Sequence, residues 1–111
     1  MSSREDQNIL PMAVTLLVKY VSLEDNALPH RRVRSLHGES GELRWEHSRE
    51  QAIAHISDEV FHYFFHKDGR AVRVVLDRTT KGELFLKAEM DLESPHALLQ
   101  LPKFSPDNRP I

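Results

Sequence analysis

The most regular alternation of apolar and polar residues occupies residues 60–89, where it predicts three consecutive antiparallel strands. The turn between the first two strands is Lys67-Asp68-Gly69-Arg70. Asp and Gly tolerate the positive φ angles that both central positions of a two-residue type I′ turn require. The pattern therefore predicts a hairpin in which Lys67 pairs with Arg70.

Counting outward from this turn assigns each side chain to one face of the sheet. A slip of one residue would turn the whole apolar set toward water, so the register is strongly specified. The predicted pairs on the apolar face are Phe65 with Val72, Tyr63 with Val74, and Phe61 with Leu76. After a polar loop at residues 78–82, the third strand continues the apolar face with Leu84, Leu86, Ala88 and Met90.

Three further stretches are also expected to be strands. Residues 12–21 are largely apolar at both alternating sets of positions, which is typical of a strand inside a sheet rather than at its edge. Residues 32–36 and 43–46 predict two short strands around a tight reversal that contains two glycines. Trp45 lies in the second of these strands, and we expect it to pack beneath the element that follows.

That element is a helix over residues 49 to about 57. Ser48 and Gln51 have the spacing of a capping box, in which each side chain bonds to the backbone of the other residue. Apolar residues at positions 52, 53 and 56 form one stripe, so the helix should lie on the apolar face of the sheet. An alternative is a helix that continues to His66 and places His62 one turn before it. The density of aromatic residues at 60–66 favours the strand.

Ser94-Pro95 has the pattern of a second helix start, followed by leucines that end before Pro102. The sequence thus predicts an α+β fold, with a mostly antiparallel sheet of five or six strands, one capped helix on one face and a short C-terminal helical turn. We expect a single domain over residues 9–104. Residues 1–8 are expected to be a disordered lead-in, and residues 105–111 a flexible tail.

Three short motifs resemble a family of small bacterial proteins catalogued as a domain of unknown function. They are Ser48-Arg49-Glu50-Gln51-Ala52-Ile53, Phe85-Leu86-Lys87-Ala88-Glu89-Met90-Asp91 and Leu98-Leu99-Gln100-Leu101-Pro102. The resemblance covers about residues 33–104 and implies a similar order of strands around one helix. No activity is attached to the family, so the resemblance concerns the fold alone.

Composition narrows the function classes. The chain has 111 residues, no cysteine and a net charge of −2, which argues against disulfides, a thiolate metal site and wholesale binding of polyanions. The longest apolar stretch is far too short to span a membrane. We therefore expect a soluble, cytoplasmic protein with no membrane partner. One basic cluster, formed by Arg31, Arg32 and Arg34, is a candidate basic patch.

Motifs for catalysis and for metal or cofactor binding are absent. The seven histidines show no ligand spacing, and on a strand His62 and His66 would lie about 13 Å apart, too far to share one ion. Ser94, His96 and Asp91 are close in sequence without a nucleophile elbow. The glycine-containing turns match no phosphate-binding motif. We expect no enzyme activity, no metal and no cofactor.

One constellation remains, on the polar side of the three predicted strands. The predicted register sets Phe64 beside Arg73 and Arg73 opposite Lys87, where two cations need an anionic or aromatic neighbour. We call this surface the ribbon face; it consists of His62, Phe64, His66, Arg73, Phe85 and Lys87. We expect a non-enzymatic module for protein interaction or self-association. The alternative is binding of single-stranded nucleic acid, because rings interleaved with cations suit stacked bases and phosphates.

Overall fold

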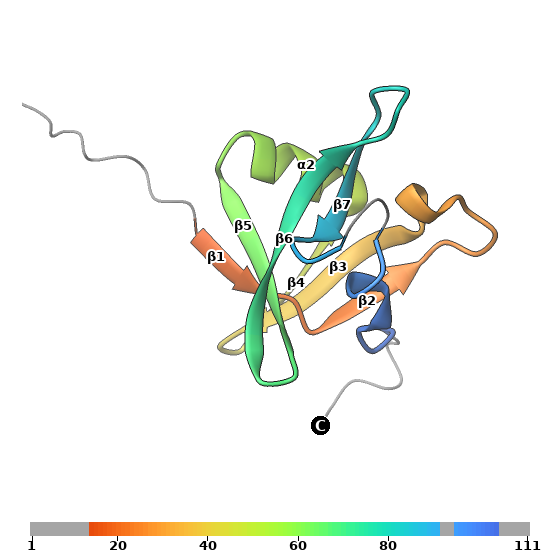
Figure 1. Ribbon diagram of the computed structural model, residues 1–111. Helices are drawn as coiled ribbons and strands as arrows, with labels where there is room; N and C mark the ends of the chain where they lie inside the picture. Colours follow the sequence, from red (N-terminus) through yellow and green to blue (C-terminus); the bar gives the residue numbers. More distant parts are fainter. Residues whose placement is uncertain (1–13, 92–94, 105–111) are drawn as a thin grey trace, which may run out of the picture.

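The computed structural model describes residues 14–91 and 95–104. The expected lead-in at residues 1–8 and tail at residues 105–111 lie outside this part. The described strands are β1 (Val14–Leu17), β2 (Tyr20–Leu23), β3 (Val33–Ser40), β4 (Leu43–Ser48), β5 (Phe61–Lys67), β6 (Arg70–Arg78) and β7 (Leu84–Ala88). The helix α2 (Arg49–Ser57) and the 3-10 turns η1 (Pro29–Arg31) and η2 (Leu98–Gln100) complete the α+β fold (Figure 1).

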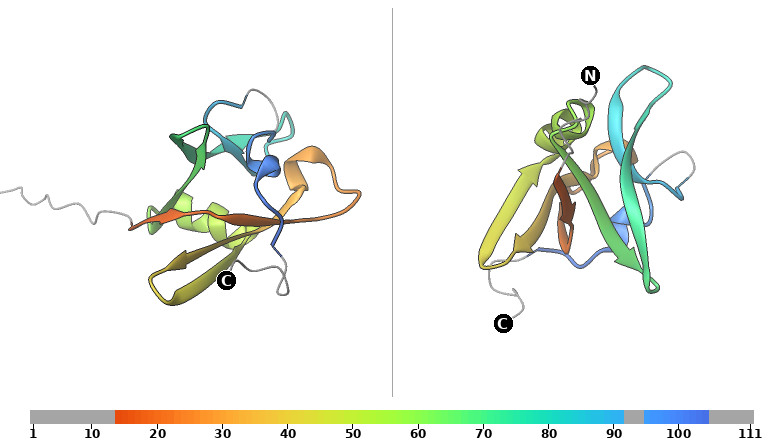
Figure 2. Two further views of the ribbon diagram at one scale, coloured as in Figure 1. Left: turned by 90° about the horizontal axis from the view of Figure 1, so that it is seen from below. Right: turned by 90° about the vertical axis from the view of Figure 1, so that its left-hand side faces the viewer.

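The strands form two sheets, so the prediction of a single sheet of five or six strands is wrong. One sheet has the order β1-β5-β6-β7 and the other the order β2-β3-β4. The two sheets diverge like the sides of a wedge, and α2 lies across one end of it (Figure 2). The core fills the space between them, with Leu36, Tyr63 and Phe65 among its largest fully buried side chains.

The predicted strand at residues 12–21 is divided between the two sheets. β1 pairs in parallel with β5, and β2 pairs antiparallel with β3. At the break, the Val18 amide donates to the Phe64 carbonyl at 2.7 Å, and the Lys19 amide donates to the His37 carbonyl at 2.8 Å. Both segments are therefore edge strands, and the placement inside one sheet is wrong. Of the apolar residues in this stretch, Val18 and Val21 are buried in the core, whereas Val14 is exposed.

The hairpin of β5 and β6 has the predicted register from Lys67 and Arg70 to Tyr63 and Val74. Asp68 and Gly69 have φ angles of 53° and 79°, as a type I′ turn requires. The ladder between β5 and β6 ends at the pair of Tyr63 and Val74. The predicted pair of Phe61 with Leu76 does not extend this ladder.

Between β6 and β7 the predicted register is wrong by two residues. Lys87 opposes Val75 and Phe85 opposes Asp77, whereas we expected Arg73 and Val75 at these positions. The hydroxyl of Thr79 accepts from the amides of Lys81 and Glu83, so the loop begins one residue later than its composition indicated. A shift of two residues leaves each side chain on its predicted face.

Helix α2 begins and ends where predicted. Ser48 accepts from the Gln51 amide at 3.1 Å, and the Gln51 side chain accepts from the Ser48 amide at 2.9 Å, which completes the capping box. Ala52 is fully buried against the core. The alternative helix through His66 is wrong, since residues 61–67 form β5. Trp45 packs against the core and its ring centre lies 5.8 Å from that of Tyr63.

The C-terminal segment closes the fold over β2. The predicted cap Ser94 lies outside the described residues, and the structure shows Asp91 in an anchoring role. Its carboxylate accepts from the amides of Ala88, His96 and Ala97. Beyond η2, the Val21 amide donates to the Pro102 carbonyl, and the Phe104 amide donates to the Val21 carbonyl. These bonds hold residues 102–104 alongside β2.

Candidate functional site

One half of the predicted ribbon face forms as expected. Phe64 lies opposite Arg73, and its ring packs against His66 with a centre-to-centre distance of 5.6 Å. Arg73 and His66 are exposed, while Phe64 and His62 are partly buried. His62 opposes Thr15 of β1. This end of the sheet thus presents a small mixed surface of rings and one guanidinium group.

The other half of the ribbon face is occupied by contacts within the chain. Phe85 is only 1% exposed, and the ring of His30 in η1 lies 6.1 Å from it. Lys87 bonds through Nζ to the Asp77 carboxylate at 2.6 Å. This hydrogen bond holds the pKa of Asp77 below its ordinary value. Phe85 and Lys87 of the ribbon face are therefore engaged by contacts within the chain.

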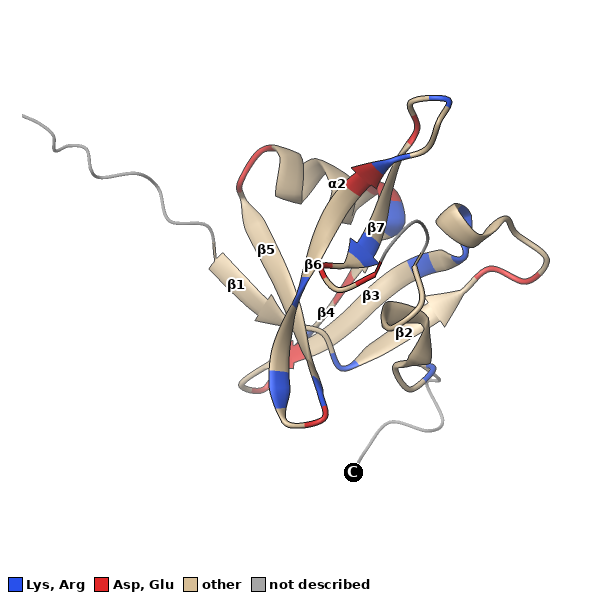
Figure 3. Cartoon of the chain, in the orientation of Figure 1, with Lys and Arg blue, Asp and Glu red and all other residues tan. Residues whose placement is uncertain are grey.

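The basic cluster is also partly neutralised. Arg31 donates two hydrogen bonds, of 2.8 and 2.7 Å, to the Glu83 carboxylate. These bonds lower the pKa of Glu83 to about 2. Arg34 lies 3.9 Å from Glu24, and the Nε of Arg32 is buried without a partner among the described residues. Figure 3 shows Lys and Arg interspersed with Asp and Glu along the described part of the chain.

A different surface, on the three-stranded sheet, shows a more concentrated arrangement. Leu36 faces the core, so its neighbours along β3 point away from it. We call the side away from the core the outer face; its side chains are those of Tyr20, Ser22, Ser35, His37, Glu39, Arg44 and Glu46. His37 is 3% exposed although it lies on this outer face. Its ring is covered by the ring of Phe104, which stacks on it at 4.0 Å with an interplanar angle of 3°.

His37 is held by two hydroxyl groups. Its Nε2 lies 2.8 Å from the Oγ of Ser22 and 2.8 Å from the Oγ of Ser35. Burial lowers the pKa of His37, an effect that the nearby Glu46 carboxylate opposes. The Nδ1 of His37 is 4.0 Å from the Glu46 carboxylate, beyond hydrogen-bond distance. This carboxylate therefore does not orient the imidazole as the acid of a catalytic triad does.

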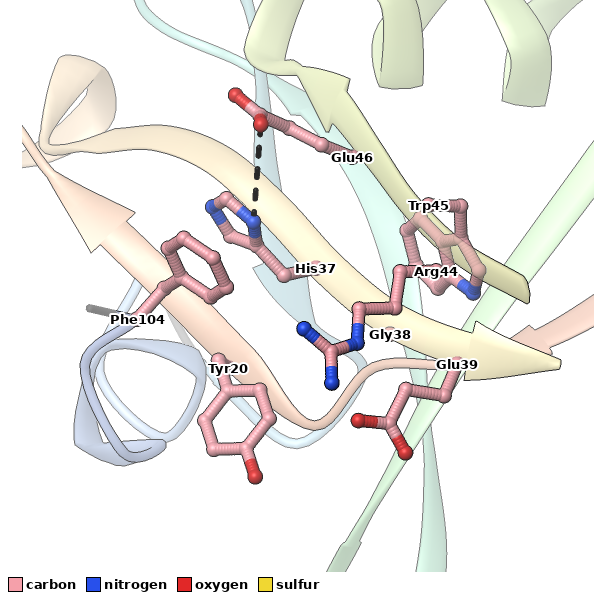
Figure 4. Close-up of a pocket in the computed structure, with 8 residues that line it drawn as sticks. All are labelled: Tyr20, His37, Gly38, Glu39, Arg44, Trp45, Glu46 and Phe104. Carbon is pink, nitrogen blue, oxygen red and sulfur yellow. Dashed lines mark ion pairs between the residues drawn. The ribbon is translucent and has the colours of Figure 1, made fainter. Parts of the chain in front are cut away.

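A pocket of about 180 Å³ opens on the outer face. It is lined by Tyr20, His37, Gly38, Glu39, Arg44, Trp45, Glu46 and Phe104 (Figure 4). A cavity of about 150 Å³ holds a benzene molecule, so this pocket has room for one ring or one amino-acid side chain. Figure 4 shows Tyr20 and Phe104 on one side and Arg44 with Glu39 on the other. The outer-face pocket thus combines apolar walls with charges of both signs.

The pocket lies beside an open strand edge. β4 has a neighbouring strand on one side only within the described part of the chain. The hairpin turn at Gly41 and Glu42 has two residues, with a positive φ only at Gly41, which is typical of type II′. In such a hairpin every second residue bonds to the partner strand, beginning with Leu43. The N–H and C=O groups of Arg44 and Glu46 therefore point outward from the sheet.

A second group of titratable side chains lies in the core and joins β4, α2 and β5. The hydroxyl of Tyr63 is 2.7 Å from Nδ1 of His47 and 2.9 Å from Nδ1 of His55. Burial raises the pKa of Tyr63 far above its ordinary value. Burial, and then the charge of His55, lowers the pKa of His47. One hydroxyl proton can be donated to only one imidazole, so the two rings hold opposite Nδ1 tautomers.

Comparisons with protein-family models, with curated proteins and with solved structures found no significant match for this chain. The family resemblance noted above stays a prediction. Among the described residues, no helix has the length and apolar composition needed to cross a membrane. The same residues contain no group of three His, Cys, Asp or Glu side chains placed to hold a metal ion.

The sequence analysis did not identify the outer-face pocket. Its lining comes from β2, β3, β4 and the segment after η2, and the stacking of Phe104 on His37 joins residues far apart in the chain. No motif connects these segments. The one available signal was the polar alternation of Ser35, His37 and Glu39 in β3, which marks an outward face without indicating what covers it.

Proposed function

We propose that this protein is a non-enzymatic, cytoplasmic interaction module that binds an extended polypeptide on the outer face of its three-stranded sheet. The observation that supports the proposal most directly is the position of the outer-face pocket beside the open edge of β4. An extended segment can add to a sheet edge through main-chain hydrogen bonds, while alternate side chains enter neighbouring pockets. Arg44 and Glu46 take part in both features, because they line the pocket and expose their backbone groups.

The chain itself illustrates this mode of binding. Residues 102–104 lie along β2 through two backbone hydrogen bonds, and Phe104 places its ring against His37. The opposite edge of the same sheet, at β4, has no such cover among the described residues. Native sheets commonly blunt an open edge with charged side chains, and those of Arg44 and Glu46 serve that purpose in the free protein. An added strand would satisfy their backbone groups.

The ribbon face supports a binding function less well. Phe85 and Lys87 are engaged with η1 and Asp77, so a platform for stacked bases is reduced to Phe64, His66 and Arg73. Arg31 of the candidate basic patch is neutralised by Glu83. We therefore base the proposal on the outer face.

Selection from a library of random displayed peptides tests the proposal. Peptides would be enriched on the wild-type protein alone and then titrated against Arg44→Pro, which removes an outward N–H and places proline where an edge strand tolerates it. We expect enriched peptides that bind the wild-type protein and Arg73→Ala equally and lose at least tenfold in affinity for Arg44→Pro. Peptides that bind Arg44→Pro as tightly as the wild type would place the binding surface elsewhere and contradict the proposal.

A further inference from the structure

The geometry of β4 points to one particular partner, which is a second copy of the same chain. We infer that two β4 strands pair antiparallel about a two-fold axis at Trp45 and join the two three-stranded sheets into one. This inference rests on the proposed function, because it names the polypeptide that adds to the β4 edge. It is carried by the backbone pattern of the strand and by the order of its charges.

The backbone pattern allows the pairing. Outward N–H and C=O groups belong to Arg44 and Glu46, on either side of Trp45. In an antiparallel pair centred on Trp45, Arg44 lies opposite the partner's Glu46, and each of these two pairs exchanges two hydrogen bonds. The dimer therefore gains four main-chain bonds without moving β4 from its place beside β3.

The charges select this register from the alternatives. Pairing between outward residues can be centred at Arg44, at Trp45 or at Glu46. Centring at Arg44 would place it opposite the partner's Arg44, and centring at Glu46 would place two carboxylates opposite each other, which is destabilising. Only the register centred at Trp45 makes two pairs of opposite charge. Both side chains lie on the outer face and are exposed, with the Glu46 side chain 65% exposed, so they are accessible to a partner.

The other side chains of β4 are also compatible with the antiparallel pairing of two β4 strands. Trp45 lies at the two-fold axis, opposite the partner's Trp45, on the side of the sheet that faces the core. Its ring is only partly buried in the monomer. Leu43, which is 75% exposed, comes to lie opposite the partner's His47 and loses part of its contact with water.

The contact is short, so the dimer is weak. A five-residue strand pair buries much less surface than a stable interface of about 1,600 Å². Self-association is therefore expected at concentrations between about 10 µM and about 1 mM rather than at nanomolar concentrations. A weak dimer is compatible with exchange for another strand-forming partner at the same edge.

Charge reversal tests the register. Sedimentation equilibrium would be measured for the wild type, Arg44→Glu, Glu46→Arg and the double variant R44E/E46R. Each single reversal places like charges opposite each other twice, so we expect the dimer dissociation constant to rise at least tenfold. The double variant restores both pairs with the signs exchanged and should dimerise within about threefold of the wild type. Because both positions are exposed, these variants should keep the wild-type melting temperature.

A wild-type protein that stays monomeric to about 1 mM would overturn the inference, as would a dimer that the single reversals leave unchanged. A double variant that does not recover would overturn the register centred at Trp45. The proposed function has its own test, because peptides sensitive to Arg44→Pro can be selected whether or not the protein dimerises. Failure of the dimer and failure of the binding edge are therefore distinguishable.

Discussion

The two sheets of this protein differ in how well the sequence pattern indicates which of their side chains form an accessible surface. The four-stranded sheet carries the prominent aromatic and basic pattern, yet two of its members, Phe85 and Lys87, are engaged in contacts within the chain. The three-stranded sheet looks unremarkable in sequence but has the pocket, the buried His37 and an open edge at β4. Residues that stand out in the sequence pattern can thus be structural, while the proposed binding surface is assembled from segments far apart in the chain.

The largest expected effect is on the three-stranded sheet. A methyl group at Gly38 would collide with the Trp45 ring and with the Leu17 carbonyl, so Gly38→Ala should cost about 3 kcal/mol of unfolding free energy. Gly41→Ala is the matched control, since its Cβ would meet open space and only its φ of 64° opposes the change, at a cost of about 1 kcal/mol. Urea denaturation measures both. Equal losses would mean that Trp45 does not pack tightly over Gly38.

The next effect concerns the link between the sheets. Asp91→Ala removes the acceptor of three backbone amides, one at the last residue of β7 and two just before η2, and should cost about 2 kcal/mol. Asp91→Asn keeps one carbonyl oxygen and should lose about half as much. Thermal denaturation of the two variants checks the order. If both variants melt like the wild type, residues 95–104 are held in place without Asp91.

A smaller effect is expected for the hairpin that defines the four-stranded sheet. Gly69 has a φ of 79°, which a β-branched side chain adopts only under strain, so Gly69→Val should cost about 1–2 kcal/mol. There is open space around this position, so the loss would come from the backbone alone. An unchanged denaturation midpoint would contradict the type I′ turn and the register built on it.

The smallest effect is a pH dependence located at the outer face. Because burial lowers the pKa of His37 below its ordinary value of 6.5, the unfolded chain binds more protons than the folded chain just below that pH. Stability should therefore be fully present above pH 6.5 and decline as the pH falls toward the folded pKa of His37. His47, whose pKa is also lowered, contributes in the same direction. Denaturation at several pH values would show this slope.

The variant Phe104→Ala distinguishes the contribution of His37 to the pH dependence of stability from that of His47. It uncovers His37 on the outer face and leaves His47 in the core, so it should raise the pKa of His37 toward 6.5 and reduce part of the pH slope. NMR titration of the imidazole signals would assign the change. A His37 signal that titrates identically in the variant would show that stacking by Phe104 does not keep the ring from water.

The sequence could predict elements whose determinants are local. The Asp68-Gly69 turn and the capping box of Ser48 and Gln51 depend on residues within a few positions of each other, and both are confirmed. The division of residues 12–21 between two sheets was not predictable in the same way, because hydrogen bonds from Val18 and Lys19 to distant strands produce it. The register of β7 depended on the Thr79 hydroxyl, which no hydrophobic pattern reports.

The candidate site was less predictable than the fold, because it depends even more on contacts between residues that lie far apart in the chain. Phe64 and Arg73 were placed correctly beside each other because the register of β5 and β6 was predicted correctly, and the change of register at β7 left each side chain on its predicted face. Whether a face is free depends on what packs against it, and the covering of Phe85 by η1 and of His37 by Phe104 is set by tertiary contacts. Alternation along a strand tells which way a side chain points and leaves its neighbours undetermined.

The central claim is that the β4 edge, rather than the ribbon face, is the interacting surface. It is tested most directly by ¹H–¹⁵N spectra of the wild-type protein recorded from about 10 µM to about 1 mM. We expect concentration-dependent shifts that are largest at the Arg44 and Glu46 amides, which gain hydrogen bonds, and small at the His47 amide, which already bonds to β3. Shifts centred on Phe64 and Arg73, with Arg44 and Glu46 unchanged, would contradict it.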